Sequence, residues 1–244
     1  RRAVRSSIPD SDPTLKIEEV TRGLLRILQA ISGAVHDPGH SGGLVMADAD
    51  PSRERLSPRH PTSLEESARA VYDRIIASRS QGRASPNLLV TTDGALVGPF
   101  NAMVAAPHVG GPLADLGAAL RYRGHLTDRA RELSILTVAA RSESEFEWQS
   151  HVGIARNLGI TVDILDAIRI GGVPSTLTDP IERAVVAATA RLLEGSELDD
   201  VEYAGLVELI GEDGVIELVV LVGYYELLAR LLRVLRVGTS AVAG

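Results

Sequence analysis

The chain contains no cysteine among its 244 residues. This absence excludes disulfide bonds, thiolate metal sites and any mechanism that oxidises and reduces a protein thiol. Aromatic residues are also scarce, at 3% of the sequence, so a hydrophobic core must be built from Leu, Val, Ile and Ala. The hydrophobic content of 45% is ample for one large domain or two small ones.

Long uncharged apolar runs are absent as well. The longest apolar stretch, residues 215–228, is interrupted by Glu217 and Glu226 and is too short for a membrane span. The formal net charge of −7 disfavours nucleic acids and anionic membranes as partners. The first residues, RRAVRSS, lack the apolar core of a secretory signal. We therefore expect a cytoplasmic protein with no nucleic-acid or membrane partner.

Composition divides the chain near residue 61. Residues 14–35 show helical periodicity, whereas residues 36–61 are rich in Gly, Pro and Ser. We expect residues 1–61 to form an N-terminal arm, with a helix at 14–35 and a linker that contacts a partner subunit. Residues 62–240 should then form the main domain.

The main domain has the pattern of an all-α bundle. Thr62 and Glu65 have capping-box spacing and predict a helix that begins at Thr62. The fragment LLVTT (88–92) is the only strand-like one. Short connections predict antiparallel neighbouring helices. Glycines that follow periodic segments predict helix ends at Gly159, Gly171, Gly195 and Gly211. The further expected helices cover 101–106, 112–123, 127–141, 143–158, 161–170, 179–194, 199–210 and 213–235.

The segment from Glu132 to His151 carries the candidate catalytic residues. Ser144, Glu147 and His151 are seven and four residues apart, which places them on one face of a helix, and Glu132 lies on the helix before. A histidine with two nearby carboxylates can transfer protons, because burial and mutual repulsion raise the pKa of one acid. Both observations also have a purely structural interpretation. Glu147 and His151 could form a pair on the protein surface, and Glu132 could stabilise the first turn of its helix through the helix dipole.

Ser144 is not expected to be a nucleophile, since it lies two helical turns from His151 and no G-x-S-x-G elbow surrounds it. We interpret it as a pocket-lining group or a cap. Glu132, Glu147 and His151 could share a metal ion, but the spacing Glu-x3-His departs from the common zinc and di-iron motifs. We therefore predict no metal and no cofactor.

The same spacing carries a resemblance to a known family. Glu132, Ser144, Glu147 and His151 stand at the positions of the E-x11-C-x2-C-x3-H motif of the carboxymuconolactone decarboxylase / alkylhydroperoxidase D family. The strings PFNAM, LTDRARELSILTVAARS, EFEWQSHVGIARNLGI and VIELVVLVGYYELL also resemble a long, cysteine-free branch of it. The resemblance implies a helical bundle and a homo-oligomer, from dimer to hexamer. It does not imply thiol peroxidase activity, because both cysteine positions are replaced.

The resemblance also implies which residues surround a substrate. The loop with Phe100 and Asn101 covers the pocket in the family, and the helix with Tyr224 and Tyr225 lies near it. Trp148, the only tryptophan, stands beside Glu147 and is a further candidate for substrate binding. Glu217 is expected to be structural, paired with an arginine such as Arg121 or Arg123.

These observations predict a cofactor-independent acid–base enzyme that acts on a small organic acid, lactone or carbonyl compound. Decarboxylation, isomerisation, elimination and cyclisation all fit such a site. Two alternatives remain open: a peroxidase-like relative that has lost its thiol pair, and a non-catalytic oligomeric protein that binds a ligand.

Overall fold

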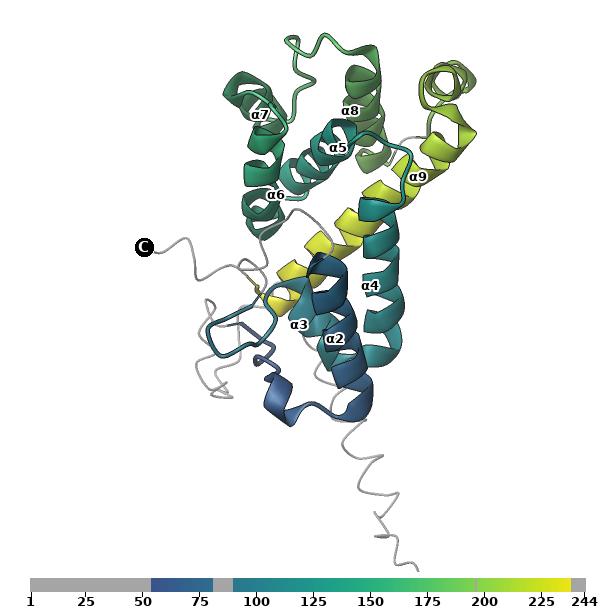
Figure 1. The fold of residues 1–244 in the computed structure, drawn as a ribbon. Helices are drawn as coiled ribbons and strands as arrows, with labels where there is room; N and C mark the ends of the chain where they lie inside the picture. The colour runs from purple at the N-terminus through teal and green to yellow at the C-terminus, as the bar shows by residue number, and fades with distance from the viewer. Residues whose placement is uncertain (1–53, 81–89, 196, 238–244) are drawn as a thin grey trace, which may run out of the picture. The chain divides into compact units, whose positions relative to one another are not determined.

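The structure is a computed structural model that describes residues 54–80, 90–195 and 197–237 (Figure 1). The predicted helix at 14–35 lies outside the described residues. Within them the fold is all-α, as expected, and the only extended pairing is one bridge between Val90 and Leu96. The helices are a 3-10 turn η1 (Pro61–Ser63), α2 (Glu66–Ser80), α3 (Pro99–Ala105), α4 (Pro107–Tyr122), α5 (Asp128–Arg141), α6 (Glu145–Asn157), α7 (Val162–Arg169), α8 (Pro180–Leu193) and α9 (Asp200–Leu235).

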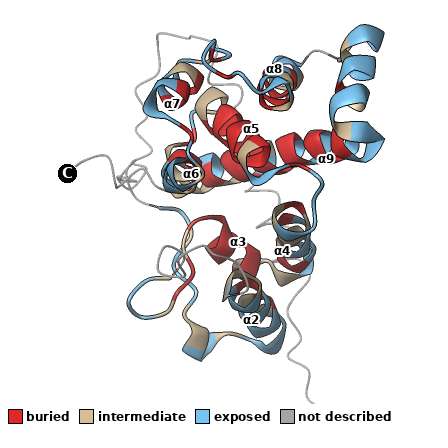
Figure 2. Cartoon of the chain, turned by 45° about the horizontal axis from the view of Figure 1, so that its top comes forward, coloured by how far each residue is buried: buried red, intermediate tan, exposed pale blue. Residues whose placement is uncertain are grey.

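Helix α5 is the central element of the domain. It contacts α6, α7, α8 and α9, and its residues 130–139 are all buried (Figure 2). Thr127 caps the helix by accepting a hydrogen bond from the amide of Ala130. A helix that is buried on every side positions its polar residues firmly, because they cannot turn towards bulk water.

Two apolar clusters lie on either side of α5. The first includes Ile135 and Val138 together with residues of α2, α3, α4, α8 and α9. The second includes Leu133 and Leu136 with residues of α6, α7 and α8. Glu132 lies on the same helix as Leu136 and Ala139 of the second cluster and is buried like them.

Helix α9 contains a break at Gly211, whose φ of +73° is outside the helical region. The predicted helices 199–210 and 213–235 correspond to the two parts on either side of this break. Glycine allows this backbone conformation because it has no Cβ. Asp199 and Glu202 form the expected capping box at the start of α9.

The predicted helix start at Thr62 is wrong. Residues Pro61–Ser63 form only a 3-10 turn, Leu64 is extended, and α2 begins at Glu66. The extended backbone of Leu64 separates Thr62 from the helix, so the expected capping box does not form.

The described end of the predicted linker packs on the main domain. The amide and guanidinium of Arg55 donate hydrogen bonds to the carbonyls of Leu235 and Val234, at 2.9 and 3.0 Å. Asn101 on α3 holds the same segment: its amide nitrogen donates to the carbonyl of Ser57 and its oxygen accepts from the amide of Arg59. None of the described helices is long and apolar enough to cross a membrane.

Candidate active site

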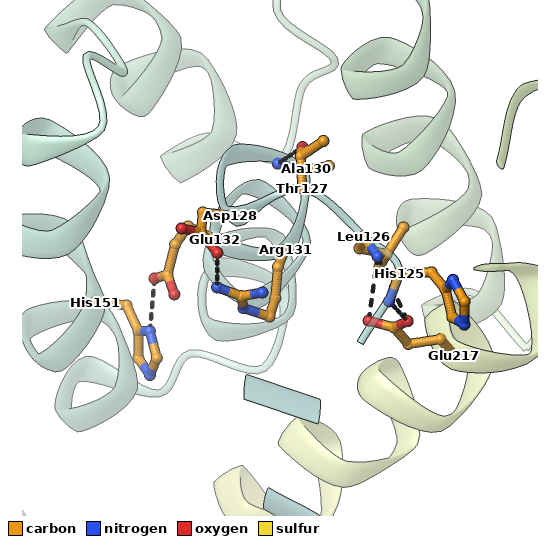
Figure 3. Close-up of polar contacts among 9 residues, drawn as sticks. All are labelled: His125, Leu126, Thr127, Asp128, Ala130, Arg131, Glu132, His151 and Glu217. Atoms are coloured by element: carbon orange, nitrogen blue, oxygen red, sulfur yellow. Dashed lines mark hydrogen bonds and ion pairs between the residues drawn. The ribbon is translucent and has the colours of Figure 1, made fainter. Parts of the chain in front are cut away.

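Glu132 and His151 form a buried hydrogen bond between α5 and α6. Nδ1 of His151 lies 2.7 Å from Oε2 of Glu132 (Figure 3). His151 is 6% exposed and Glu132 is 3% exposed, so water does not compete for this contact. The short turn between α5 and α6 folds the second helix back, which brings together residues that are nineteen positions apart in the sequence.

Glu147 lies on the other side of the imidazole. Its Oε2 is 3.8 Å from Nε2 of His151, which is too long for a hydrogen bond. Its Oε1 is buried and has no hydrogen-bond partner among the described residues. Burial raises the pKa of the Glu147 carboxyl, although the charges of His151, Arg121 and Arg79 act in the opposite direction. We refer to Glu132, Glu147 and His151 as the acid–histidine cluster.

Tyr225 of α9 borders the acid–histidine cluster. Its ring packs edge-on against the imidazole of His151, with centroids 5.3 Å apart and an interplanar angle of 86°. Its hydroxyl accepts a hydrogen bond from Arg121 of α4 at 3.4 Å. Burial raises the pKa of the Tyr225 phenol, so the hydroxyl keeps its proton at neutral pH.

Tyr224 packs against the ring of Tyr225. The rings of Tyr224 and Tyr225 are 5.3 Å apart at 81°. A Cβ on Gly117 of α4 would lie 2.2 Å from the Tyr224 hydroxyl, so a glycine is needed for the phenol to approach that helix. The helix with Tyr224 and Tyr225 is expected near the pocket; Tyr225 contacts His151 of the cluster directly, and Tyr224 contacts Tyr225.

The other predicted substrate-binding residues have structural contacts of their own. Trp148 lies in the second apolar cluster, and its ring is covered by the guanidinium of Arg169 at 4.5 Å. Asn101 holds residues 57–59 through both ends of its amide. Ser144 is the N-cap residue of α6, but its side chain makes no capping hydrogen bond.

Glu217 is buried, as predicted, but its predicted arginine partner is wrong. Its carboxylate accepts hydrogen bonds from the backbone amides of His125 and Leu126, before the start of α5 (Figure 3). Gly124 leaves room for this carboxylate, because a Cβ there would lie 2.1 Å from Oε1. Backbone amides can satisfy a buried carboxylate without a counter-charge. The sequence does not show which backbone amides will lie near Glu217, so this partner could not be predicted.

Sequence reasoning missed the position of two arginines near the acid–histidine cluster. Arg121 contacts Tyr225, and the guanidinium of Arg79 stacks on Phe100 at 4.8 Å. A signal was present: Arg79 follows the buried residues Val71 and Ile75 at four-residue intervals on α2. An arginine that continues a buried helical face is unusual enough to mark a site.

Among the described residues, no group of three or more His, Asp or Glu side chains has the geometry to hold a metal ion. The acid–histidine cluster is therefore best described by its hydrogen bond and its unpaired carboxyl oxygen. Together these groups can bind, hold and pass a proton.

Comparison with known proteins agrees with this architecture. Residues 107–191 match the model of the carboxymuconolactone decarboxylase family. A solved alkylhydroperoxidase AhpD core, an uncharacterized peroxidase-related protein from Ralstonia eutropha JMP134, has a TM-score of 0.58 and 16% identity, over 74% of this chain and 89% of its own. The debrominase Bmp8, solved as a variant with 2,3,4-tribromopyrrole, has a TM-score of 0.56 and 12% identity, over 78% of this chain and 95% of its own.

No curated protein matches the sequence. At identities of 16% and 12%, the two solved structures show the fold alone. The family match covers Glu132, Glu147 and His151 and confirms the resemblance seen in the sequence. Residues 107–191 are thus similar to the carboxymuconolactone decarboxylase family, and the described helices have the all-α fold of the alkylhydroperoxidase AhpD core.

Proposed function

We propose that this protein is an acid–base enzyme that transfers protons on a small organic acid, lactone or carbonyl compound without a cofactor. The observation that carries the proposal is the buried imidazole of His151, with one carboxylate bonded to Nδ1 and a second carboxyl near Nε2. Catalytic histidines are commonly oriented in this way by an acid on one nitrogen while the other nitrogen acts.

Glu132 acts as a positioning residue in this proposal. As a carboxylate it accepts a hydrogen bond from Nδ1–H, which leaves the lone pair of the neutral imidazole on Nε2. When Nε2 takes up a proton, the Glu132 carboxylate stabilises the imidazolium at a distance of 2.7 Å.

Glu147 supplies the complementary acid. Because burial favours its protonated form, it can give a proton to a substrate oxygen while His151 removes a proton from carbon. In that step the C–H electron pair forms the C=C bond of an enol, and the carbonyl π pair moves to oxygen, which takes the proton of Glu147. Return of a proton to another carbon gives isomerisation, and departure of a β leaving group with its electron pair gives elimination. In a decarboxylation the C–C bond to the carboxylate breaks instead of the C–H bond, its electron pair forms the same enol, and carbon dioxide leaves.

The two rival functions have less support. A peroxidase of the thiol type needs cysteines, and the chain has none. A non-catalytic binding protein gives no reason to orient a buried histidine between two carboxyls.

The test is deuterium exchange into a panel of small keto acids, lactones and β-keto acids in D2O, read by mass spectrometry. The wild type should accelerate exchange or carbon dioxide release for at least one compound, and His151→Ala should abolish the effect. His108→Ala, at an exposed histidine, is the matched control and should behave like the wild type. Equal rates for the wild type and His151→Ala on every compound would refute the proposal.

We also propose that the protein is a homo-oligomer of two to six subunits. The outer face of α9 supports this, because apolar side chains recur along it at helical spacing and remain exposed. They include Ile216, Val219, Val220 and Leu227. Light scattering should give a mass of at least a dimer, and a mass near 25.9 kDa at micromolar concentration would exclude it.

A further inference from the structure

Arg79 and Arg121 differ from the other arginines in the interior of the described residues. Arg129, Arg131 and Arg141 each pair with an acidic side chain, at 2.6, 2.5 and 2.9 Å respectively. Arg79 and Arg121 are half-buried, yet neither forms an ion pair with any of the described residues. Their guanidinium groups instead meet aromatic groups: Phe100 for Arg79, and Tyr122 and Tyr225 for Arg121.

Arg79 and Arg121 come from α2 and α4, which pack against each other, and the charge of Arg121 acts on Arg79. Burial, together with the charge of Arg121, lowers the pKa of Arg79 to about 10. Two like charges in a partly desolvated place are unfavourable unless an anion lies between or beside them. The protein therefore maintains a local excess of positive charge that its own described side chains do not neutralise.

Glu147 is an acid whose carboxyl feels the charges of both arginines, but it does not form an ion pair with either one among the described residues. Burial also favours the protonated form of Glu147, because it raises the pKa of that carboxyl. The phenols of Tyr122, Tyr224 and Tyr225 also face the arginines, but they are neutral near pH 7, and burial raises the pKa of Tyr224 and Tyr225. An external anion is the group that this arrangement lacks.

Tyr225 connects the guanidinium group of Arg121 to the acid–histidine cluster, because it contacts both Arg121 and His151. The hydroxyl of Tyr225 accepts the hydrogen bond of Arg121, and the ring of the same residue packs on His151. An anionic group bound by Arg121 would therefore lie one phenol ring away from the imidazole. That separation suits a small molecule whose charged end and reacting carbon are a few bonds apart.

We propose that Arg79 and Arg121 form an anion subsite that binds the carboxylate of an organic acid and directs its carbon skeleton towards Glu147 and His151. The planar guanidinium fork matches the two oxygens of a carboxylate and donates parallel hydrogen bonds to them. The second half of this proposal rests on the proposed function, because it assigns the substrate class of the same site. The first half, carboxylate binding, stands independently of turnover.

Calorimetric titration separates the two halves. The probes are succinate and benzoate, their neutral amides succinamide and benzamide, and inorganic phosphate, all at constant ionic strength. The wild type should bind at least one of the two carboxylates and neither amide. Arg79→Gln and Arg121→Gln should each weaken that binding about tenfold or more, since each removes a charged hydrogen-bond donor.

Three controls make the result specific. Arg123→Gln, two residues from Arg121 but exposed and without an ion pair among the described residues, should bind the carboxylate as the wild type does. Arg121→Lys keeps the charge and should keep the fold, yet it should weaken binding because a lysine lacks the planar fork. Circular dichroism should give the same helix content for every variant.

His151→Ala distinguishes a failure of this proposal from a failure of the proposed function. It should retain carboxylate binding while losing proton exchange, so binding without any exchange activity would overturn only the proposed function. The subsite is overturned if neither carboxylate binds, if an amide binds equally well, if phosphate alone binds, or if Arg123→Gln weakens binding as much as Arg121→Gln.

Discussion

The imidazole of His151 is perpendicular to the phenol ring of Tyr225 while its Nδ1 is held by Glu132. The ring of the histidine is thus fixed in two ways, by a hydrogen bond within its plane and by an aromatic edge. The Nε2 side faces Glu147 and has no close hydrogen-bonding partner among the residues that the structure describes.

Glu132→Gln should disturb the tautomer of His151. A glutamine can accept or donate at Nδ1, so the preference for a proton on Nδ1 is weakened. Nitrogen-15 NMR of His151 should show mainly the Nδ1–H form in the wild type and a mixture in the variant. The rate of proton exchange should fall about a hundredfold or more. An unchanged tautomer with an unchanged rate would show that Glu132 has only a packing role.

Glu147→Gln should change how stability depends on pH. The folded-state pKa of Glu147 is raised, so its contribution to the free energy of unfolding is complete below the usual glutamate pKa and is lost as pH rises through the raised value. Glutamine stays neutral throughout. The variant should therefore gain stability relative to the wild type as pH rises, measured by urea unfolding at several pH values. The exposed variant Glu208→Gln should give a curve parallel to the wild type, and a parallel curve for Glu147→Gln would contradict the prediction.

Glu217→Ala should lower the free energy of unfolding by about 2 kcal/mol or more, because it leaves the amides of His125 and Leu126 without their acceptor. Glu217→Gln keeps one acceptor oxygen and should cost less. Urea unfolding checks both, with Glu212→Ala as the control at an exposed position of the same helix. Equal effects of Glu217→Ala and Glu212→Ala would mean that the carboxylate does not hold the segment before α5.

Dithiothreitol should not support hydroperoxide reduction by the purified, metal-free protein. The catalytic cycle of a thiol peroxidase passes through a disulfide, and this chain cannot form one. Consumption of cumene hydroperoxide should match that of a protein-free control. Sustained turnover above the control would show that another group performs the redox step.

The sequence predicts helices best where local chemistry is decisive. Gly159, Gly171, Gly195 and Gly211 all adopt positive φ, from +72° to +82°, as expected of residues that end helical segments. The capping pattern at Thr62 fails because Leu64 is extended and separates Thr62 from α2. The segment just before it is held by Asn101, more than forty positions away, which a local pattern does not include. Tertiary contacts override the weaker local preference there.

The candidate site was predictable in part. The helical offset of four residues places Glu147 beside His151, and the turn before α6 returns Glu132 to the same level. Arg79 and Arg121 come from helices that no local pattern connects, so only the packing of α2 and α4 reveals that they are neighbours. The catalytic roles of these residues stay predictions until activity is measured.

The complete burial of residues 130–139 has a consequence for the order in which the molecule opens. Amide protons of α5 should be the slowest to exchange with solvent, because no partial opening exposes a helix that is covered on every side. Helix α6, which has exposed residues among its buried ones, can open by itself. Local opening would then separate His151 from Glu132 well before the domain unfolds. The pair would be lost by movement of the histidine, while the carboxylate stays in place.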